Sequence, residues 1–405
     1  MSATRTTEVV IAGAGIGGVA AAYQLAVRAG VPRVMVVDPR EPLSLTTSRG
    51  SEAYRNYWPG PDDTMARFMD RSIDLLEALD RESGQAFALN RRGYVFLTAD
   101  AVEARRLRAT AGPTTDFLAN APDIRARYPF VTDRVVAMLH ARRAGYMNAL
   151  ALGRWLLERA VAHGVDFVRD QVSDVIVEHG RFTGVRLASG GRIAARSFVL
   201  AAGPRLPEWA QRLELDVPIV NELHGKISFD DEAGVVPRDA PMMIWNDSVE
   251  IAGVGTFPAG VHMRPRGERS LLGIWTYDAR IEEARPDPIF PAQYADIVLA
   301  GLTVMIPGLA VYRGRGREAT VDGGYYCKTP DNRPLVGPTT VAGVFLLGAL
   351  SGFGVMASQA AAELVAAHVL EQPLAGYAAA FLPGRFDDPA YRRGLAAADA
   401  RHGQL

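Results

Sequence analysis

The hydrophobic pattern at the start of the chain predicts a compact β-α-β unit. A β-branched apolar run at 8–12 is followed by the glycine-rich segment 13–18 and by a helical stretch that continues to Ala29. A second apolar strand at 34–37 ends at Asp38. This order of strand, glycine turn, helix and strand is typical of a nucleotide-binding fold.

Further along, the spacing of apolar residues changes between that of helices and that of strands. Helical spacing predicts an amphipathic helix at 65–79 and another at 149–164, and a polar, arginine-rich stretch that ends near Arg127 is expected to hold further helices. Short apolar runs predict strands at 93–97, 165–167, 172–177, 184–187 and 196–201.

The last half of the chain predicts a second sheet and then a return to the first pattern. From 218 to about 280, short apolar runs alternate with Gly, Pro and Asp turns, which predicts an antiparallel sheet. A mostly helical connection is expected to continue to about Met305. A buried strand at 344–347, a glycine-rich turn at 348–354 and a long helix at 355–370 then repeat the nucleotide-binding pattern.

These elements predict an α/β protein of two discontinuous domains. One is a Rossmann-like dinucleotide-binding domain, and the other is an α+β substrate domain built on the antiparallel sheet. We expect the first at 1–86, 146–206 and 321–405, and the second at 87–145 and 207–320. A catalytic pocket is expected where the two domains meet.

The composition narrows the classes of function. Apolar residues make up 48% of the 405 positions and charged residues 22%, the balance of a soluble globular protein. The net charge of −1 offers no basic field for nucleic acid or an anionic membrane. A single cysteine, Cys327, excludes an internal disulfide and a cysteine-rich metal site, and no metal is expected. The start of the chain lacks a signal-peptide pattern and the run at 9–26 is interrupted by glycines, so we expect a cytoplasmic protein without a membrane span.

The glycines of the first turn have the spacing that binds the diphosphate of a dinucleotide. Gly13 allows the tight turn, Gly15 lets the backbone approach the diphosphate, and Gly18 lets the helix pack against the strand. The amides of the helix N-terminus, beginning at Ile16, favour negative charge. Asp38 can accept hydrogen bonds from the ribose hydroxyls and would repel a 2′-phosphate. We therefore expect FAD or NAD rather than NADP.

A second glycine-rich turn favours FAD over NAD. The segment 348–354 lies near the other end of the chain, again between an apolar strand and a helix. A nicotinamide dehydrogenase would normally keep its cofactor contacts in the N-terminal half. The N-terminus of this second helix can face the isoalloxazine ring and stabilise a reduced, anionic flavin.

Five segments follow one another along the chain: the first glycine turn, the segment 47–56 (TSRGSEAYRN), the strand end at 201–204, the loop 329–334 (TPDNRP) and the closing glycine turn. In this order they resemble the D-amino-acid oxidase superfamily of FAD enzymes, in its glycine oxidase and sarcosine oxidase branch. The resemblance covers nearly the whole chain and implies that the Rossmann-like domain binds FAD. Besides the residues named above, it implies FAD contacts by Arg40, Ser48, Arg49, Gly50, Ser51, Val172, Ala202, Gly203, Gly348, Gly352, Phe353, Gly354, Val355 and Met356.

Two departures from this branch bear on the cofactor and the substrate. Sarcosine oxidases have a lysine in the closing turn that helps to bind the substrate carboxylate, and Met356 stands at that position. The same enzymes attach FAD covalently through a cysteine, where this chain has Gly324. Cys327, three residues later, is expected to point elsewhere and to fill apolar space. We therefore expect non-covalent FAD and a substrate other than sarcosine.

Three residues are the candidates for catalysis. Arg55 matches a basic position that the family often uses on the substrate side, where a guanidinium can grip a carboxylate. Lys226 is a candidate ammonium for oxygen activation, and His262 lies in the predicted antiparallel sheet that forms the pocket wall in the family. A solvated surface position is the competing interpretation for Arg49 and Arg55, and a structural or surface role is the competing interpretation for the histidines. The same sheet contributes further candidates for the wall, namely His224, Trp245, Arg264, Trp275 and Tyr277.

The resemblance implies oxidation of a small amine or amino acid. A hydride would pass from the carbon next to nitrogen to flavin N5, the imine would hydrolyse, and oxygen or another acceptor would take up the electrons. The amine must be deprotonated, but a dedicated acid–base residue is not obligatory. Two alternatives stay open: oxidation of a 2-hydroxy acid, which needs a base such as His262 or His224, and a non-catalytic flavin-binding protein. The sequence names neither the substrate nor the oligomeric state.

Overall fold

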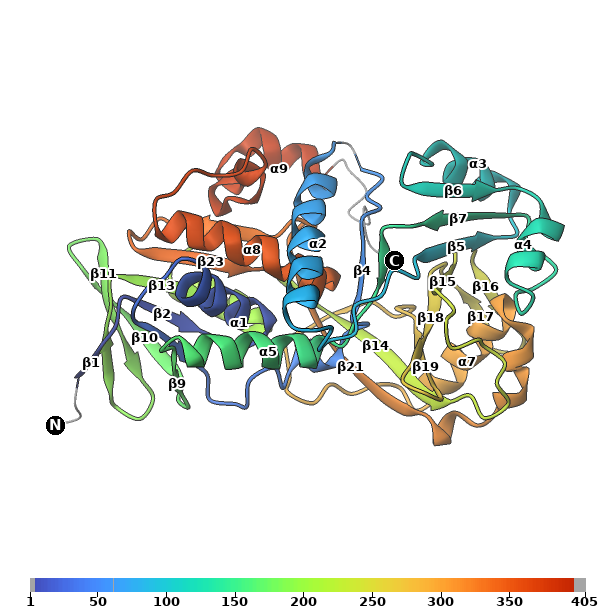
Figure 1. Ribbon diagram of the computed structural model, residues 1–405, viewed down its shortest axis with the longest axis horizontal. Coiled ribbons are helices and arrows are strands. Elements are labelled where there is room, and N and C mark those ends of the chain that lie inside the picture. Colours follow the sequence, from blue (N-terminus) through green and yellow to red (C-terminus); the bar gives the residue numbers. More distant parts are fainter. Residues whose placement is uncertain (1–3, 61, 397–405) are drawn as a thin grey trace.

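The computed structural model describes residues 4–60 and 62–396, which are arranged around two large β-sheets (Figure 1). The two sheets lie toward opposite ends of the molecule, with α2 (Thr64–Glu82) and β4 (Ala53–Arg55) between them. The start of the expected N-terminal segment and the end of the expected C-terminal tail, 397–405, lie outside the described residues.

One sheet has six strands in the order β22-β23-β13-β2-β3-β9. Neighbours are parallel except β22, which runs antiparallel to β23. The central strands are short, continuous apolar runs because both faces of the sheet are covered. The six strands are β2 (Val9–Ala12), β3 (Val34–Val37), β9 (Asp166–Val168), β13 (Ser197–Leu200), β22 (Leu335–Pro338) and β23 (Val344–Gly348).

Helices cover one face of this sheet, and a four-stranded sheet in the order β1-β12-β11-β10 covers the other. Ile11 of β2 belongs to the core on the helical side and Val10 to the core on the sheet side, since successive side chains of a strand point to opposite faces. The covering elements are α1 (Ile16–Tyr23), α2 (Thr64–Glu82), α5 (Ala149–Ala162), α8 (Gly354–Val369), β1 (Thr4–Thr6), β10 (Val172–Glu178), β11 (Arg181–Leu187) and β12 (Arg192–Ala194).

The other large sheet has nine strands, in the order β20-β14-β19-β18-β15-β5-β7-β6, with β21 also paired with β14. Its neighbours are antiparallel except β15 and β5, which are parallel. Helix α7 (Tyr294–Met305) packs against it and closes a second core. The nine strands are β5 (Tyr94–Thr98), β6 (Thr115–Leu118), β7 (Ala137–Ala141), β14 (Val220–Asp230), β15 (Met242–Trp245), β18 (Val261–Arg266), β19 (Ser270–Ile274), β20 (Arg280–Ile281) and β21 (Thr320–Lys328).

The remaining elements are smaller. Strand β4 pairs with β8, and β16 pairs with β17. The remaining strands and α-helices are β4 (Ala53–Arg55), β8 (Ala144–Tyr146), β16 (Val249–Ile251), β17 (Gly255–Phe257), α3 (Ala101–Ala109), α4 (Ala121–Arg127), α6 (Leu206–Arg212) and α9 (Pro389–Ala396).

The predicted α/β class is confirmed, but three local expectations were incomplete. The arginine-rich stretch holds α3 and α4 as predicted. Strand β6 lies between these two helices and β7 and β8 follow them, and none of the three strands was predicted. All five residues of β7 are buried, so this strand lacks the alternation that reveals a half-exposed one. The connection before α7 is irregular rather than helical because Pro286, Pro288 and Pro291 interrupt it. The helix expected to reach Ala29 continues beyond α1 as the π-helical segment η1 (Gln24–Arg28).

The exact domain boundaries stay a prediction. One strand bears on them, because β21 pairs with β14 from Thr320 to Lys328 and so belongs to the nine-stranded sheet by its hydrogen bonds. The chain then leaves this sheet for β22 and the closing glycine turn. The two parts of the molecule are therefore joined at β21, next to the site described below.

Candidate functional site

The first glycine turn forms a closely packed corner at the carboxyl end of β2. Gly13 has a φ of +109°, and a Cβ there would lie 2.3 Å from the carbonyl oxygen of Ala201. A Cβ on Gly18 would lie 1.9 Å from the carbonyl oxygen of Gly13. A Cβ on Gly15, at the N-terminus of α1, would have Thr47 Oγ1 as its nearest neighbour at 3.6 Å. Gly13 and Gly18 are therefore required by the protein itself, whereas Gly15 leaves its space to a ligand.

Asp38 holds the same corner from the end of β3. Its Oδ2 accepts a hydrogen bond from the amide of Ala14 at 2.7 Å, and its Oδ1 accepts one from the amide of Arg40 at 2.8 Å. The hydroxyl of Thr47 accepts a hydrogen bond from the amide of Ile16 at 3.1 Å, a contact that the sequence did not predict. The carboxylate thus stands beside the glycine turn, where the ribose of a dinucleotide would lie.

Two adjoining cavities form an elongated cleft along this corner. Their empty volumes, counted to the open mouth, are about 1090 and 1430 Å³, and they share residues that include Gly13, Asp38 and Ala202. The first cavity reaches the closing turn at Phe353, and the second reaches Val172. We call the two together the cofactor cleft. An elongated cleft with glycine amides in its middle and a carboxylate beside them fits FAD.

Most of the predicted cofactor contacts line this cleft. Three do not: Gly18 packs against the turn, Ser48 is turned away, and Met356 lines the neighbouring cavity described below. Arg49 and Val172 line the second cavity. The first cavity is lined by Gly13, Gly15, Ile16, Asp38, Arg40, Gly50, Ser51, Ala202, Gly203, Gly348, Gly352, Phe353, Gly354 and Val355.

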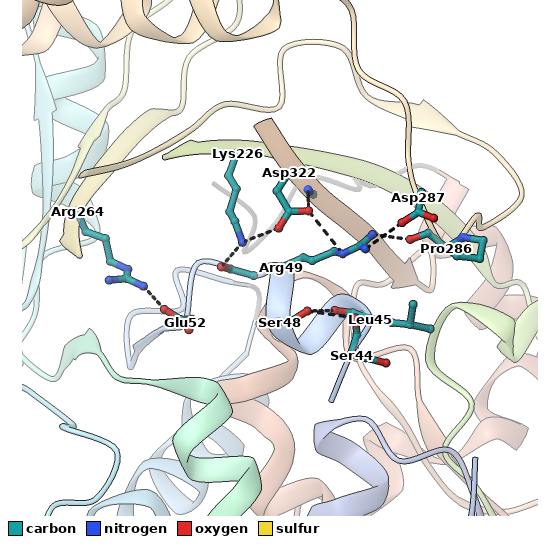
Figure 2. Close-up of polar contacts among 12 residues, drawn as sticks. Ser44, Leu45, Ser48, Arg49, Glu52, Lys226, Arg264, Pro286, Asp287 and Asp322 are labelled. Carbon is teal, nitrogen blue, oxygen red and sulfur yellow. Dashed lines mark hydrogen bonds and ion pairs between the residues drawn. The ribbon is translucent and has the colours of Figure 1, made fainter. Parts of the chain in front are cut away.

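The side chains of Ser48 and Arg49 make their hydrogen bonds with the protein (Figure 2). Ser48 Oγ donates to the carbonyl of Leu45 at 2.8 Å, within its own 3₁₀ turn. Arg49 donates to the carbonyl of Pro286 at 2.5 Å and forms ion pairs with Asp287 and Asp322. Arg49 therefore fastens the loop beside the cleft to the chain that leads toward α7.

A third cavity, of about 490 Å³, adjoins the cleft at Ser51, Tyr326, Gly352 and Phe353. We call it the substrate cavity. Two of the predicted catalytic residues, Arg55 and His262, line it, and the third does not. The rest of its wall combines apolar and hydrogen-bonding side chains, namely Tyr94, His224, Met242, Ile274, Thr276 and Met356.

Arg55 is the cation of the substrate cavity. Its guanidinium is buried, donates from Nε to the carbonyl of Tyr57 at 3.2 Å, and lies 4.8 Å from the ring centre of Trp58. Burial lowers the pKa of Arg55, and a hydrogen bond with Tyr94 opposes this shift. Since arginine remains protonated in proteins, the cavity contains a fixed positive charge with a planar pair of donors.

His262 is a neutral imidazole with a defined tautomer. Its Nδ1 lies 2.7 Å from the carbonyl oxygen of Gly260, so Nδ1 carries the proton and Nε2 keeps a lone pair. Burial lowers the pKa of His262 to about 4. Its side chain is therefore uncharged at neutral pH.

His224 is the second imidazole of the substrate cavity, and it has polar partners on both nitrogens. Nε2 lies 2.6 Å from Glu222 Oε1, and Nδ1 lies 2.5 Å from Thr276 Oγ1. Its ring stacks on Tyr326 with the two ring centres 3.5 Å apart. Lys328 Nζ lies 3.1 Å from both oxygens of Glu222. The hydrogen bond from His224, aided by Lys328, lowers the pKa of Glu222 to about 2.

Lys226 does not line the cleft or the substrate cavity. Its ammonium is buried, 3.5 Å from the carbonyl oxygen of Gly50 and 3.5 Å from Asp322 Oδ2 (Figure 2). Burial lowers the pKa of Lys226, and Asp322 opposes this shift. The lysine supports the loop beside the cleft from the side of β14, so the contacts point to positioning rather than to direct contact with substrate.

A comparison with protein families decides the identity of this cleft. The model of the family described as "FAD dependent oxidoreductase" matches residues 8–368, which include both glycine turns and the strands between them. The chain belongs to this family. It is an FAD-dependent oxidoreductase, and the cofactor cleft is the place where its residues fit FAD.

Solved structures share the fold of this flavoenzyme over nearly its whole length. L-proline dehydrogenase from P. horikoshii aligns with a TM-score of 0.79 and 21% identity, covering 95% of this chain and 99% of that one. Glycine oxidase from Geobacillus kaustophilus aligns with a TM-score of 0.79 and 17% identity, covering 94% and 99%. Iminodiacetate oxidase from Chelativorans sp. BNC1 aligns with a TM-score of 0.73 and 22% identity, covering 93% and 99%.

One curated relative of the flavoenzyme is a longer protein. The tRNA 5-methylaminomethyl-2-thiouridine biosynthesis bifunctional protein of Paracidovorax citrulli is 28% identical over 257 residues, which are 59% of this chain and 37% of that protein. Among the described residues of the flavoenzyme, no helix combines the length and the apolarity needed to cross a bilayer. Residues 4–60 and 62–396 also contain no group of three or more His, Cys, Asp or Glu side chains arranged to hold a metal.

Proposed function

We propose that this flavoenzyme oxidises the C–N bond of a small amino acid or N-substituted amino acid. The observation that carries the proposal is the buried guanidinium of Arg55 in a cavity that opens onto the closing-turn end of the cofactor cleft. The planar donors of a guanidinium match the two oxygens of a carboxylate. FAD held in the cofactor cleft would supply the hydride acceptor for the carbon next to the substrate nitrogen.

The residues of the substrate cavity are suited to hold such a substrate for reaction. Arg55 would bind the carboxylate, and its contacts with Tyr57, Tyr94 and Trp58 fix the direction of its donors. The apolar side chains of Met242, Ile274, Phe353 and Met356 would exclude water and favour the uncharged form of the amine. Three of the neighbours sharing the fold are named for substrates that combine a nitrogen with a carboxylate, which supports the same class.

We propose that FAD is bound without a covalent link. Gly324 lines the second cavity and has no side chain to attach. Cys327 lines the first cavity, but burial raises the pKa of its thiol to about 12, so it is not a thiolate at neutral pH. The nucleophile needed for attachment is therefore lacking at these two positions.

Oxidation of a 2-hydroxy acid is the second candidate, and one observation favours it. His262 is neutral and has a lone pair on Nε2, as a base that removes a hydroxyl proton requires. Arg55 would bind the carboxylate of a hydroxy acid in the same way. The two candidates therefore differ in the heteroatom next to the oxidised carbon.

Anaerobic mixing of the purified yellow enzyme with matched compounds tests the proposal. For one carbon skeleton, the amino acid, its N-methyl derivative, the 2-hydroxy acid and the amine without a carboxylate are compared by loss of the oxidised flavin absorbance. Bleaching by the first two supports the proposal, and return of the colour in air identifies oxygen as an acceptor. Bleaching by the hydroxy acids alone would establish the second candidate. Flavin that dithionite bleaches but none of these compounds bleaches would contradict the proposed substrate class.

A further inference from the structure

Strand β14 presents a row of ionisable side chains toward the site. Glu222, His224 and Lys226 alternate along the strand, so they share one face. Ile227 belongs to the opposite face, where it packs into the core of the nine-stranded sheet. The row links the substrate cavity, at His224, with a carboxylate that is 16% exposed, at Glu222.

The hydrogen bonds of this row define where the protons lie. Glu222 is ionised and can only accept, so His224 Nε2 carries the proton that joins them at 2.6 Å. The lone pair of a neutral His224 is then on Nδ1, which accepts from the Thr276 hydroxyl at 2.5 Å. Thr276 and His224 both line the substrate cavity. Tyr326 stacks on the imidazole and fixes the plane of its ring.

We propose that Glu222 and His224 form an acid–base dyad that takes up, through the hydroxyl of Thr276, the proton released by the substrate nitrogen. This inference rests on the proposed function, since it assigns the proton acceptor for a substrate that enters as an ammonium. Glu222 touches no substrate and acts through His224, so it is a positioning residue. His224 and Thr276 are the groups that exchange protons.

The proton transfer balances within the three residues. The N–H bond of the substrate ammonium breaks, and its proton forms a bond with Thr276 Oγ1. The original hydroxyl proton of Thr276 leaves for the lone pair of His224 Nδ1. The substrate is left as a neutral amine and His224 as an imidazolium, whose Nε2–H still donates to Glu222. The negative charge of Glu222 stabilises that imidazolium.

The other imidazole of the cavity is a weaker candidate for this role. His262 Nδ1 donates to a backbone carbonyl, and no carboxylate adjoins it among the contacts of the described residues. His224 has a carboxylate directly behind its ring, as an imidazole that becomes charged requires. The charged or titratable groups that face His224 from the surrounding elements are Glu222 on β14, Tyr326 and Lys328 on β21, His262 on β18, Arg55 on β4 and Tyr94 on β5.

Two substitutions on opposite sides of the dyad test the proposal. Burial lowers the pKa of His224, Glu222 opposes this shift, and Lys328 adds to it. The rate constant of anaerobic bleaching at saturating amine is measured against pH, because it reports the groups of the enzyme–substrate complex. Its acid limb is expected to move down by about one pH unit in Glu222→Gln and up in Lys328→Met. Damage to the fold would not move the acid limb of the pH profile in opposite directions in the two variants. An acid limb that moves in neither variant would overturn the dyad.

A second measurement does not depend on turnover. The chain has seven histidines, and the NMR signals of His224 in the ¹⁵N-histidine-labelled holoenzyme are those missing from His224→Asn. We expect an Nε2–H tautomer that titrates lower in Glu222→Gln and higher in Lys328→Met than in the wild type. An Nδ1–H tautomer, or one titration midpoint in all three proteins, would overturn the proposal. If no amine bleaches the flavin, the proposed function is contradicted, but this titration still tests the dyad. If amines bleach the flavin but the acid limb of the pH profile is the same in the wild type and both variants, the proposed function stands and the dyad is overturned.

Discussion

Arg264 on β18 lies 2.5 Å from the carboxylate of Glu52, and the two side chains are only 3% and 9% exposed (Figure 2). The same guanidinium donates from Nε to the carbonyl of Ser51 at 2.7 Å and lies 4.7 Å from the ring centre of Tyr146. Ser51 lines both the cofactor cleft and the substrate cavity. This pair therefore ties the loop that borders both cavities to the nine-stranded sheet.

Removing one member of this pair is expected to be costly. Arg264→Met leaves the Glu52 carboxylate buried without its partner, which should lower the free energy of unfolding by about 3–5 kcal/mol. Chemical denaturation measures this change in the free energy of unfolding. Adding Glu52→Gln to Arg264→Met should restore part of the loss, because the uncompensated charge is removed. The exposed ion pairs of Glu208 with Arg205 and Arg212 are the control, and Glu208→Gln should cost about 0–1 kcal/mol. Strictly additive effects of the two buried substitutions would contradict this account.

Replacing two glycines of the first turn by alanine is expected to have different effects. Gly15→Ala should leave the apoprotein stable, because the nearest atom to the new Cβ is Thr47 Oγ1 at 3.6 Å, but it should block the approach of the diphosphate and abolish the yellow colour. Gly18→Ala should disrupt folding, since its Cβ would lie 1.9 Å from a backbone oxygen. Thermal unfolding of the apoproteins and their flavin content after purification separate the two effects. If the Gly15→Ala protein retains FAD, the diphosphate does not bind at Gly15 but elsewhere in the cleft.

The flavin is expected to be released when the protein unfolds. Because the Cys327 thiol is protonated at neutral pH and position 324 is glycine, denaturation in acid should leave a colourless precipitate and all of the FAD in the supernatant. Cys327→Ser should bind as much flavin as the wild type. Flavin fluorescence that stays with the denatured polypeptide, and is lost from it in Cys327→Ser, would instead reveal a covalent link to this cysteine.

Replacing Arg55 by lysine is expected to weaken the binding of carboxylated substrates. A lysine has no planar pair of donors, and it loses the Nε contact with Tyr57 that directs the guanidinium. The KM for the amino acid should rise about 100-fold or more, whereas that for the corresponding amine without a carboxylate should change little. Steady-state kinetics with the two compounds measure the difference. An equal loss for both would mean that Arg55 maintains the cavity and does not bind the carboxylate.

The cofactor cleft was more predictable than the substrate cavity, for a physical reason. Gly13, Gly15 and Asp38 lie close together in a strand-turn-helix-strand unit, where local spacing determines geometry. The loop after residue 44 was predicted in outline, but the roles of its side chains were not. Ser48 and Arg49 bind the protein, whereas Thr47, which was not singled out, holds the amide of Ile16.

The substrate cavity depends on strand register, which the sequence does not reveal. Glu222 is paired with Tyr326 across β14 and β21, although the two residues are far apart in the chain. This pairing stacks Tyr326 on His224 and brings Lys328 to Glu222. Alternation along β14 could have placed Glu222 on the face of His224 and Lys226, but nothing local identified Lys328 as its partner or Thr276 as the link to the cavity.

His262 is expected to make the enzyme less stable in acid. In the unfolded chain an imidazole titrates near pH 6.5, whereas burial lowers the pKa of His262 to about 4 in the folded protein. Between these values the unfolded state binds a proton that the folded state does not, so stability that is complete above pH 6.5 is lost as the pH falls toward 4. The loss is at most about 3 kcal/mol. This loss is measured by chemical denaturation of the wild type and of His262→Gln at about pH 7.5 and about pH 4.5, which lie near the two ends of this window. The variant should lose less stability than the wild type, and an equal loss in both would show that other groups govern the acid sensitivity.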